Sequence, residues 1–192
     1  MDTAETVQLD IDYPANGQGR LVTFFRIILA IPQLIVVAIV GIGAFFAAIA
    51  GWFGVLFTGS YPQGAFNFIA GTARWYARVT AYEFLLTDQY PPFSLDDDPN
   101  YPVRLNVAYP GQVERWRCIP GITVILAIPV LIGVYVLTIV AEVCAFVAWF
   151  CIMFTGQIPQ GLFNLISMYI RWQTKAILYV VLVNTTYPSS PN

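Results

Sequence analysis

The sequence contains no histidine and few charged residues: nine lysines and arginines and eleven acidic residues make up only 10% of its 192 residues. A soluble domain has about 25% charged residues, so too little charge is present to cover a globule of this length in water. Hydrophobic residues reach 58% of the chain. The composition therefore predicts an integral membrane protein. The missing histidine also removes the commonest general base and haem ligand.

Cysteine is scarce too, with Cys118, Cys144 and Cys151 only. The number is odd and two of the three lie in apolar runs, so no disulfide framework is expected. With no Cys-x-x-Cys and no histidine, the cysteines predict packing rather than a metal site. Walker, Ser/His/Asp and Gly-rich dinucleotide motifs are missing from the sequence as well. We therefore expect a protein without enzymatic activity, cofactor or nucleic-acid partner.

The N-terminal segment, residues 1–20, is polar and acidic. It lacks the basic region and the apolar region of a cleaved signal peptide. We expect the first apolar run, which follows it, to remain in the protein as a membrane anchor.

The chain contains an internal sequence repeat of two copies. "FTGSYPQG" at residues 57–64 returns as "FTGQIPQG" at residues 154–161, and residues 20–94 align with residues 117–191 without a gap. Before each copy stands an alternating segment that ends in Tyr-Pro, "VQLDIDYP" at 7–14 and "VRLNVAYP" at 103–110. Such alternation predicts a short half-exposed β-strand. We therefore divide the chain into a first module (1–95), an acidic linker (96–102) and a second module (103–192).

Each module predicts a helical hairpin. The apolar run at 21–57 is long for one span of about 20 residues, and Pro32 is expected to divide it into an interfacial part and a spanning part at 33–57. Helices at 62–86 and 159–183 are expected to return across the membrane. The tight turns between helices depend on a left-handed glycine and on proline at the next helix start; they comprise Thr58, Gly59 and Pro62, and Thr155, Gly156 and Pro159. The expected fold is all-α, with four membrane helices as two tandem hairpins and two short cytoplasmic strands.

The arginines predict the orientation of these hairpins. Arginines cluster beside the strands and the turns carry no charge, so the positive-inside rule places both termini in the cytoplasm of a prokaryotic inner membrane; these arginines are Arg20, Arg26, Arg104, Arg115 and Arg117. Two even-numbered modules imply a parallel repeat about a two-fold axis along the membrane normal. That axis would pair the strands antiparallel, either on the helix ends or against another subunit.

A polar stripe on each returning helix needs an explanation. The stripes consist of Asn67, Arg74 and Arg78, and of Asn164, Arg171 and Lys175. Arg74 and Arg171 fall near the middle of the expected span, and Glu142 falls at the depth of Arg171, so we expect a Glu142–Arg171 ion pair. Three interpretations remain open: packing inside the bundle, binding of anionic lipid by an interfacial helix, and a solute or ion pathway.

The stretch "FTGSYPQGAFNFIAGTARWYARVTAYEFLLTDQYPPFSL" (57–95) resembles a family of prokaryotic membrane proteins of unknown function, DUF4389. The resemblance extends from the Ala-Ile-Pro helix start through Arg-Trp to Tyr-Pro-Pro-Phe. The second module departs from this pattern after Trp172, where "RVTAY" becomes "KAILY". The resemblance implies a membrane location and a repeated hairpin, and it brings no activity or catalytic residue.

Together these patterns predict a non-enzymatic accessory or scaffold subunit of the membrane. Its partners would be lipids and either other membrane subunits or further copies of itself. The alternatives are a small transporter or channel, lined by Asn67, Arg74, Asn164 and Arg171, and an organiser that binds anionic lipid. A membrane-lipid enzyme is a further alternative, and the missing catalytic cluster counts against it.

Overall fold

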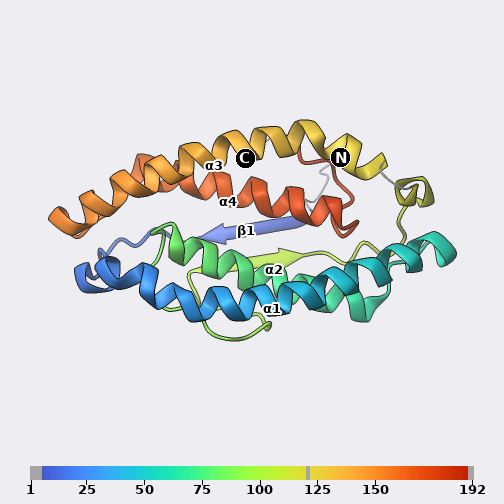
Figure 1. Ribbon diagram of the computed structural model, residues 1–192, viewed down its shortest axis with the longest axis horizontal. Helices are drawn as coiled ribbons and strands as arrows, with labels where there is room; N and C mark the ends of the chain where they lie inside the picture. The colour runs from blue at the N-terminus through green and yellow to red at the C-terminus, as the bar shows by residue number, and fades with distance from the viewer. Residues whose placement is uncertain (1–5, 120–121, 190–192) are drawn as a thin grey trace.

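The computed structural model describes residues 6–119 and 122–189. Two helical hairpins and one two-stranded sheet form the protein (Figure 1). In chain order the elements are β1 (Val7–Ile11), α1 (Arg20–Thr58), α2 (Gln63–Glu83), β2 (Val103–Val107), the 3-10 helix η1 (Arg115–Cys118), α3 (Ile122–Thr155) and α4 (Gln160–Val180).

The two first helices are continuous, and this corrects the expected break at proline. α1 has 39 residues and includes Pro32, and α3 has 34 residues and includes Pro129. Proline inside a helix removes one backbone hydrogen bond and crowds the preceding turn. Here both proline rings point outward, since both residues are exposed. The long apolar sequence on either side continues the helix past each of them.

The two helix–helix turns have the left-handed glycine and the following proline that the sequence predicts. Gly59 and Gly156 end α1 and α3 with φ of 74° and 77°, in the left-handed region that glycine adopts without a Cβ clash. Thr58 Oγ1 donates to the Gly54 carbonyl at 2.7 Å, and Thr155 Oγ1 donates to the Cys151 carbonyl at 2.7 Å. Pro62 and Pro159 then stand at the N-caps of α2 and α4.

The strands pair antiparallel, and Leu9 lies opposite Leu105 at the centre of the register. One face of the sheet is apolar and buried, as the alternation predicts. The sheet does not sit on the helix ends. It lies along the sides of α2 and α4, where β2 contacts α2 and β1 contacts α4. Each strand therefore packs on the hairpin of the other module.

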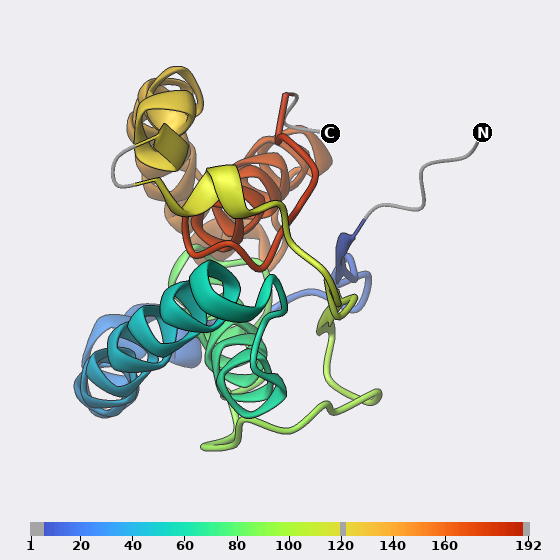
Figure 2. The same ribbon diagram turned by 90° about the vertical axis from the view of Figure 1, so that its right-hand side faces the viewer.

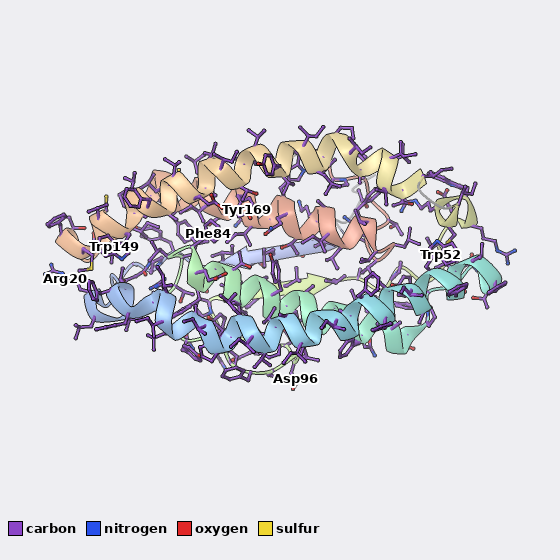
Figure 3. All side chains as sticks on the ribbon, viewed as in Figure 1. Arg20, Trp52, Phe84, Asp96, Trp149 and Tyr169 are labelled. Atoms are coloured by element: carbon purple, nitrogen blue, oxygen red, sulfur yellow. The ribbon has the colours of Figure 1, made fainter. Side chains whose placement is uncertain are left out.

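The two hairpins run in opposite directions, whereas the expected parallel repeat of membrane-crossing hairpins would place both turns at the same end. The main-chain N–H of Gln18 donates to the Gly156 carbonyl at 2.8 Å, and Ser60 forms a β-bridge with Gln112. Each turn therefore lies beside the start of the other module, and Figure 3 shows Arg20 and Trp149 at one end of the molecule with Trp52 at the other. The pseudo-two-fold axis is perpendicular to the helices. Antiparallel strands that lie along the helices require this direction.

The elements form three layers. Figure 2 shows α1 and α3 on one side, the strands on the opposite side, and α2 and α4 between them. The buried apolar core lies mainly around α2 and α4, where the strands, α1 and α3 pack against them. Phe84 and Tyr169 join the two modules near the middle, with ring centroids 5.3 Å apart.

Candidate functional site

The outer layer of the molecule is apolar and uncovered. α1 and α3 are long and apolar enough to cross a membrane, and only 11% and 22% of their most apolar stretches are buried. Large exposed apolar side chains extend from Leu21 to Phe57 on α1 and from Val124 to Phe154 on α3. Within the described ranges, α2 and α4 do not meet the same test of length and composition. The expectation of four membrane helices is thus reduced to two candidates.

The central arginines of the predicted stripes bind the sheet. Arg74 Nε donates to the Leu105 carbonyl at 3.1 Å, and Arg171 Nε donates to the Leu9 carbonyl at 3.0 Å. These two leucines face each other in the register. Each arginine therefore crosses from its own module to the strand of the other, and the two contacts repeat the pseudo-two-fold symmetry.

The expected Glu142–Arg171 ion pair does not form. Across residues 6–119 and 122–189, Arg104 pairs with Asp12 at 2.7 Å and Arg117 with Glu114 at 3.9 Å, and Glu142 pairs with none of the stripe arginines. Arg171 is turned towards the sheet instead, whereas Glu142 is an exposed residue on α3. Glu142 and Arg171 belong to the same hairpin, and equal depth along a hairpin does not fix the direction in which each side chain points.

The other stripe residues do not gather at one place. Asn67 and Asn164 are exposed near the starts of α2 and α4. Arg78 is only 1% exposed; its Nη2 donates to the Asp96 carbonyl at 2.9 Å and its guanidinium lies 5.6 Å from the centroid of the Tyr101 ring. Lys175 is buried in α4. Arg74 and Arg78 thus turn in different directions, to the sheet and to the linker, and this arrangement fits packing inside the bundle.

Two arginines outside the stripes do the same structural task in the two modules. Arg26 lies 4.7 Å from the Tyr82 ring centroid and donates to the Thr87 carbonyl at 2.9 Å. Arg117 lies 5.1 Å from the Tyr179 ring centroid and donates to the Thr185 carbonyl at 2.7 Å. The repeat alignment conceals this match, because the position equivalent to Arg26 is a threonine. The repeat of Tyr82 as Tyr179 was the sequence feature from which this pair of equivalent arginine sites could have been predicted.

Two apolar grooves, each of about 480 Å³, open beside the long helices. One lies among α1, α2 and α4, and its lining includes Gly41, Phe45, Tyr76, Ile177 and Val181. The other lies between α1 and α3, and its lining includes Arg26, Ile31, Glu83, Phe146 and Trp149. Neither lining includes Asn67, Arg74, Asn164 or Arg171. Neither groove is therefore the solute pathway expected from the sequence.

The opposite face of the molecule is polar. Gln8, Asp10, Asp12 and Asn106 are exposed on the outer surface of the sheet and just beyond it. Arg104 holds Asp12 with two hydrogen bonds of 2.7 and 2.8 Å, which lowers the pKa of that carboxyl below its usual value. Within the described part of the chain, no group of three His, Cys, Asp or Glu residues could hold a metal ion.

A family model described as "Domain of unknown function (DUF4389)" matches residues 20–94 and 121–190. The chain belongs to this family. The two matches cover the two hairpins in tandem, so the internal repeat is a repeat of the DUF4389 unit. β1 and β2 lie outside both matches, and the sheet therefore joins two DUF4389 units without being part of either. No curated protein and no solved structure shows a significant match to the chain.

Proposed function

We propose that the protein is a non-enzymatic membrane scaffold or accessory subunit. α1 and α3 anchor the protein in lipid. The exposed polar face of the sheet formed by β1 and β2 binds protein partners or further copies of the chain. The observation that carries this proposal is the separation of surfaces: apolar side chains cover one outer layer, and charged and amide side chains cover the other. An apolar surface of this extent marks contact with a membrane or another protein.

The hydrogen bonds of the arginines support a structural role for these side chains. Arg26, Arg74, Arg78, Arg117 and Arg171 all donate to main-chain carbonyl groups of their own chain. Charged hydrogen bonds of this kind stabilise a fold by about 1.5–3 kcal/mol each. Arg74 and Arg171 thus stabilise the joint between the modules, and the other three arginines stabilise the first module, the linker and the second module. We place the protein in a prokaryotic inner membrane, following the family resemblance and the arginine distribution.

One observation favours a second role in lipid binding. The groove among α1, α2 and α4 is lined almost entirely by apolar side chains and opens beside the exposed surface of α1. Its volume of about 480 Å³ lies in the range of small-molecule sites, about 300–1,000 Å³. An acyl chain matches this lining, so the scaffold would also retain or organise lipid.

Native mass spectrometry after gentle detergent extraction tests the scaffold proposal. We expect co-purifying protein chains or a defined homo-oligomer, and loss of that assembly when the sheet face is altered by Gln8→Arg and Asn106→Arg. Gln63→Arg and Asn67→Arg form the matched control, because both residues are exposed but lie at the start of α2. An unaltered monomer that carries only lipid would contradict the scaffold role and favour the lipid-binding one.

A further inference from the structure

The exposed apolar length of the two long helices exceeds the thickness of a bilayer. At 1.5 Å per residue, the 39 residues of α1 extend over about 58 Å and the 34 residues of α3 over about 51 Å. The hydrocarbon layer is about 30 Å thick. To stay within it while crossing, α1 would have to tilt by about 60°, whereas membrane helices tilt by about 0–40°. A crossing orientation would therefore leave many apolar side chains in water.

The polar sheet lies at the wrong depth for a crossing orientation. Both strands lie beside the middle of the helices and run along them (Figure 1). Asp10 and Asp12 are exposed on this face, and the acidic segment 96–98 also borders the long side of the molecule (Figure 3). If the helices crossed the bilayer, these charges would face its centre, where each would cost at least ~2.5 kcal/mol.

We propose that α1 and α3 lie in the plane of the membrane within one leaflet, and that the pseudo-two-fold axis coincides with the membrane normal. A helix is about 10–12 Å across and one leaflet has about 15 Å of hydrocarbon, so a single layer of helices fits. α2 and α4 then lie at the level of the lipid head groups, and the sheet faces water. This inference rests on the proposed membrane anchoring and specifies its geometry.

The positions of the polar groups agree with this placement. The buried residues of α1 form one stripe towards α2, and the rest of its circumference is apolar and exposed, as immersion in hydrocarbon requires. Glu142 stands three residues before Ala145 and seven before Trp149, which line the groove between α1 and α3. This spacing places Glu142 on the side of α3 that borders the groove, whose lining includes Arg26 and Glu83.

The placement predicts that both ends of the molecule face the same compartment. Gln112 lies beside the first turn and Gln157 lies in the second, at opposite ends of the long axis, and both side chains are exposed. Single cysteines at these positions and at Asn106 can be introduced after Cys118, Cys144 and Cys151 are replaced by alanine. A membrane-impermeant maleimide, applied to intact cells and to lysed cells, then reports the side of each position.

We expect Gln112→Cys, Gln157→Cys and Asn106→Cys to react on the same side, and Ile42→Cys and Ile139→Cys on the long helices to stay unreactive on both sides. Reaction of Gln112→Cys and Gln157→Cys from opposite sides would overturn the inference and show that the helices cross, with the sheet facing an aqueous lumen of an oligomer. If alkaline carbonate strips the protein from membranes, the membrane anchoring itself fails, so the two failures are distinguishable.

A second measurement needs no substitution. Polarised infrared spectroscopy of the unaltered protein in aligned bilayers of phosphatidylethanolamine and phosphatidylglycerol reports the mean direction of the helices. All four helices run roughly along one axis (Figure 1), so their amide dichroism does not average out. We expect the dichroism of helices parallel to the bilayer. Dichroism of helices along the bilayer normal would contradict the placement even if the cysteine-free protein did not fold.

Discussion

At the scale of single residues, the arginines of α1, α2 and α4 donate to main-chain carbonyls, whereas Arg104 on β2 pairs with the carboxylate of Asp12. The outer edges of a two-stranded sheet carry carbonyl groups without a strand partner. Arg74 and Arg171 each bind one of these groups at the centre of the sheet. Arginine suits this task because its charge persists at any relevant pH and its fork offers five donors.

Removal of either central arginine should therefore loosen the sheet. We expect Arg74→Ala and Arg171→Ala each to lower the free energy of unfolding by about 1.5–3 kcal/mol, since a charged hydrogen bond is lost. Amide hydrogen exchange in both strands should rise at the same time. Arg115→Ala is the control, because Arg115 is exposed. Unfolding curves in detergent measure the loss, and equal curves for Arg115→Ala and Arg171→Ala would refute this account.

The geometry also predicts that Glu142 and Arg171 are energetically independent. In a double-mutant cycle with Glu142→Gln and Arg171→Gln, the two effects should add within about 0.5 kcal/mol. A parallel cycle on Asp12 and Arg104, which are in contact, should give a coupling of about 0.2–1 kcal/mol, as exposed pairs do. A larger coupling for Glu142 and Arg171 than for the contacting pair would restore the ion pair expected from the sequence.

At the scale of elements, local signals in the sequence were sufficient where the chemistry is local. Thr-Gly followed by Pro predicted both turns, and the alternation around Leu9 and Leu105 predicted the strands and the face that they bury. The continuity of α1 through Pro32 was not predictable in the same way. A proline ends a helix or stays within it according to what surrounds its ring, and that depends on the tertiary structure.

The linkers before the two hairpins offer a matched test of one contact between the modules. Gly17 and Gly111 both have positive φ, 81° and 61°, so alanine at either position costs about 1–2 kcal/mol of backbone strain. A Cβ on Gly17 would also lie 2.7 Å from the Gly156 carbonyl oxygen, whereas nothing lies within 4 Å of a Cβ on Gly111.

We therefore expect Gly17→Ala to destabilise the protein by about 1–3 kcal/mol more than Gly111→Ala does. The extra loss should come from separation of the first linker from the second turn, and chemical denaturation of the two variants compares them directly. Equal midpoints would mean that this approach of the first linker to the second turn is not maintained in solution.

At the scale of the whole molecule, the sequence revealed the repeat but not the direction of the axis that relates its two copies. A tandem repeat is compatible with parallel or antiparallel hairpins, and the sequence does not show whether the antiparallel strands lie on the helix ends or along the helices, which would decide between them. The direction depends on contacts between the modules that pair residues far apart in the sequence. Tyr13 donates to the Ile158 carbonyl and Tyr109 to the Tyr61 carbonyl. No local sequence pattern predicts the partner of either tyrosine.

This exchange of strands leads to a prediction about the first module alone. Residues 1–98 contain β1, α1 and α2, but the surface of α2 that holds β2 would be empty. A second copy of the same fragment can fill it, because the symmetry already aligns Leu9 with Leu105 and Arg74 with Arg171. Two copies would pair Leu9 with Leu9, and each Arg74 would bind the other copy's Leu9 carbonyl.

We therefore expect the fragment 1–98 to form a homodimer in mild detergent, and we expect Arg74→Ala to shift it towards monomer. Gln63→Ala, at the exposed start of α2, should leave the dimer intact. Native mass spectrometry gives the stoichiometry. A folded, stable monomer would show that β1 can pack on the hairpin of its own module, and the exchange of strands would then be a consequence of the linker rather than of the symmetric contacts described above.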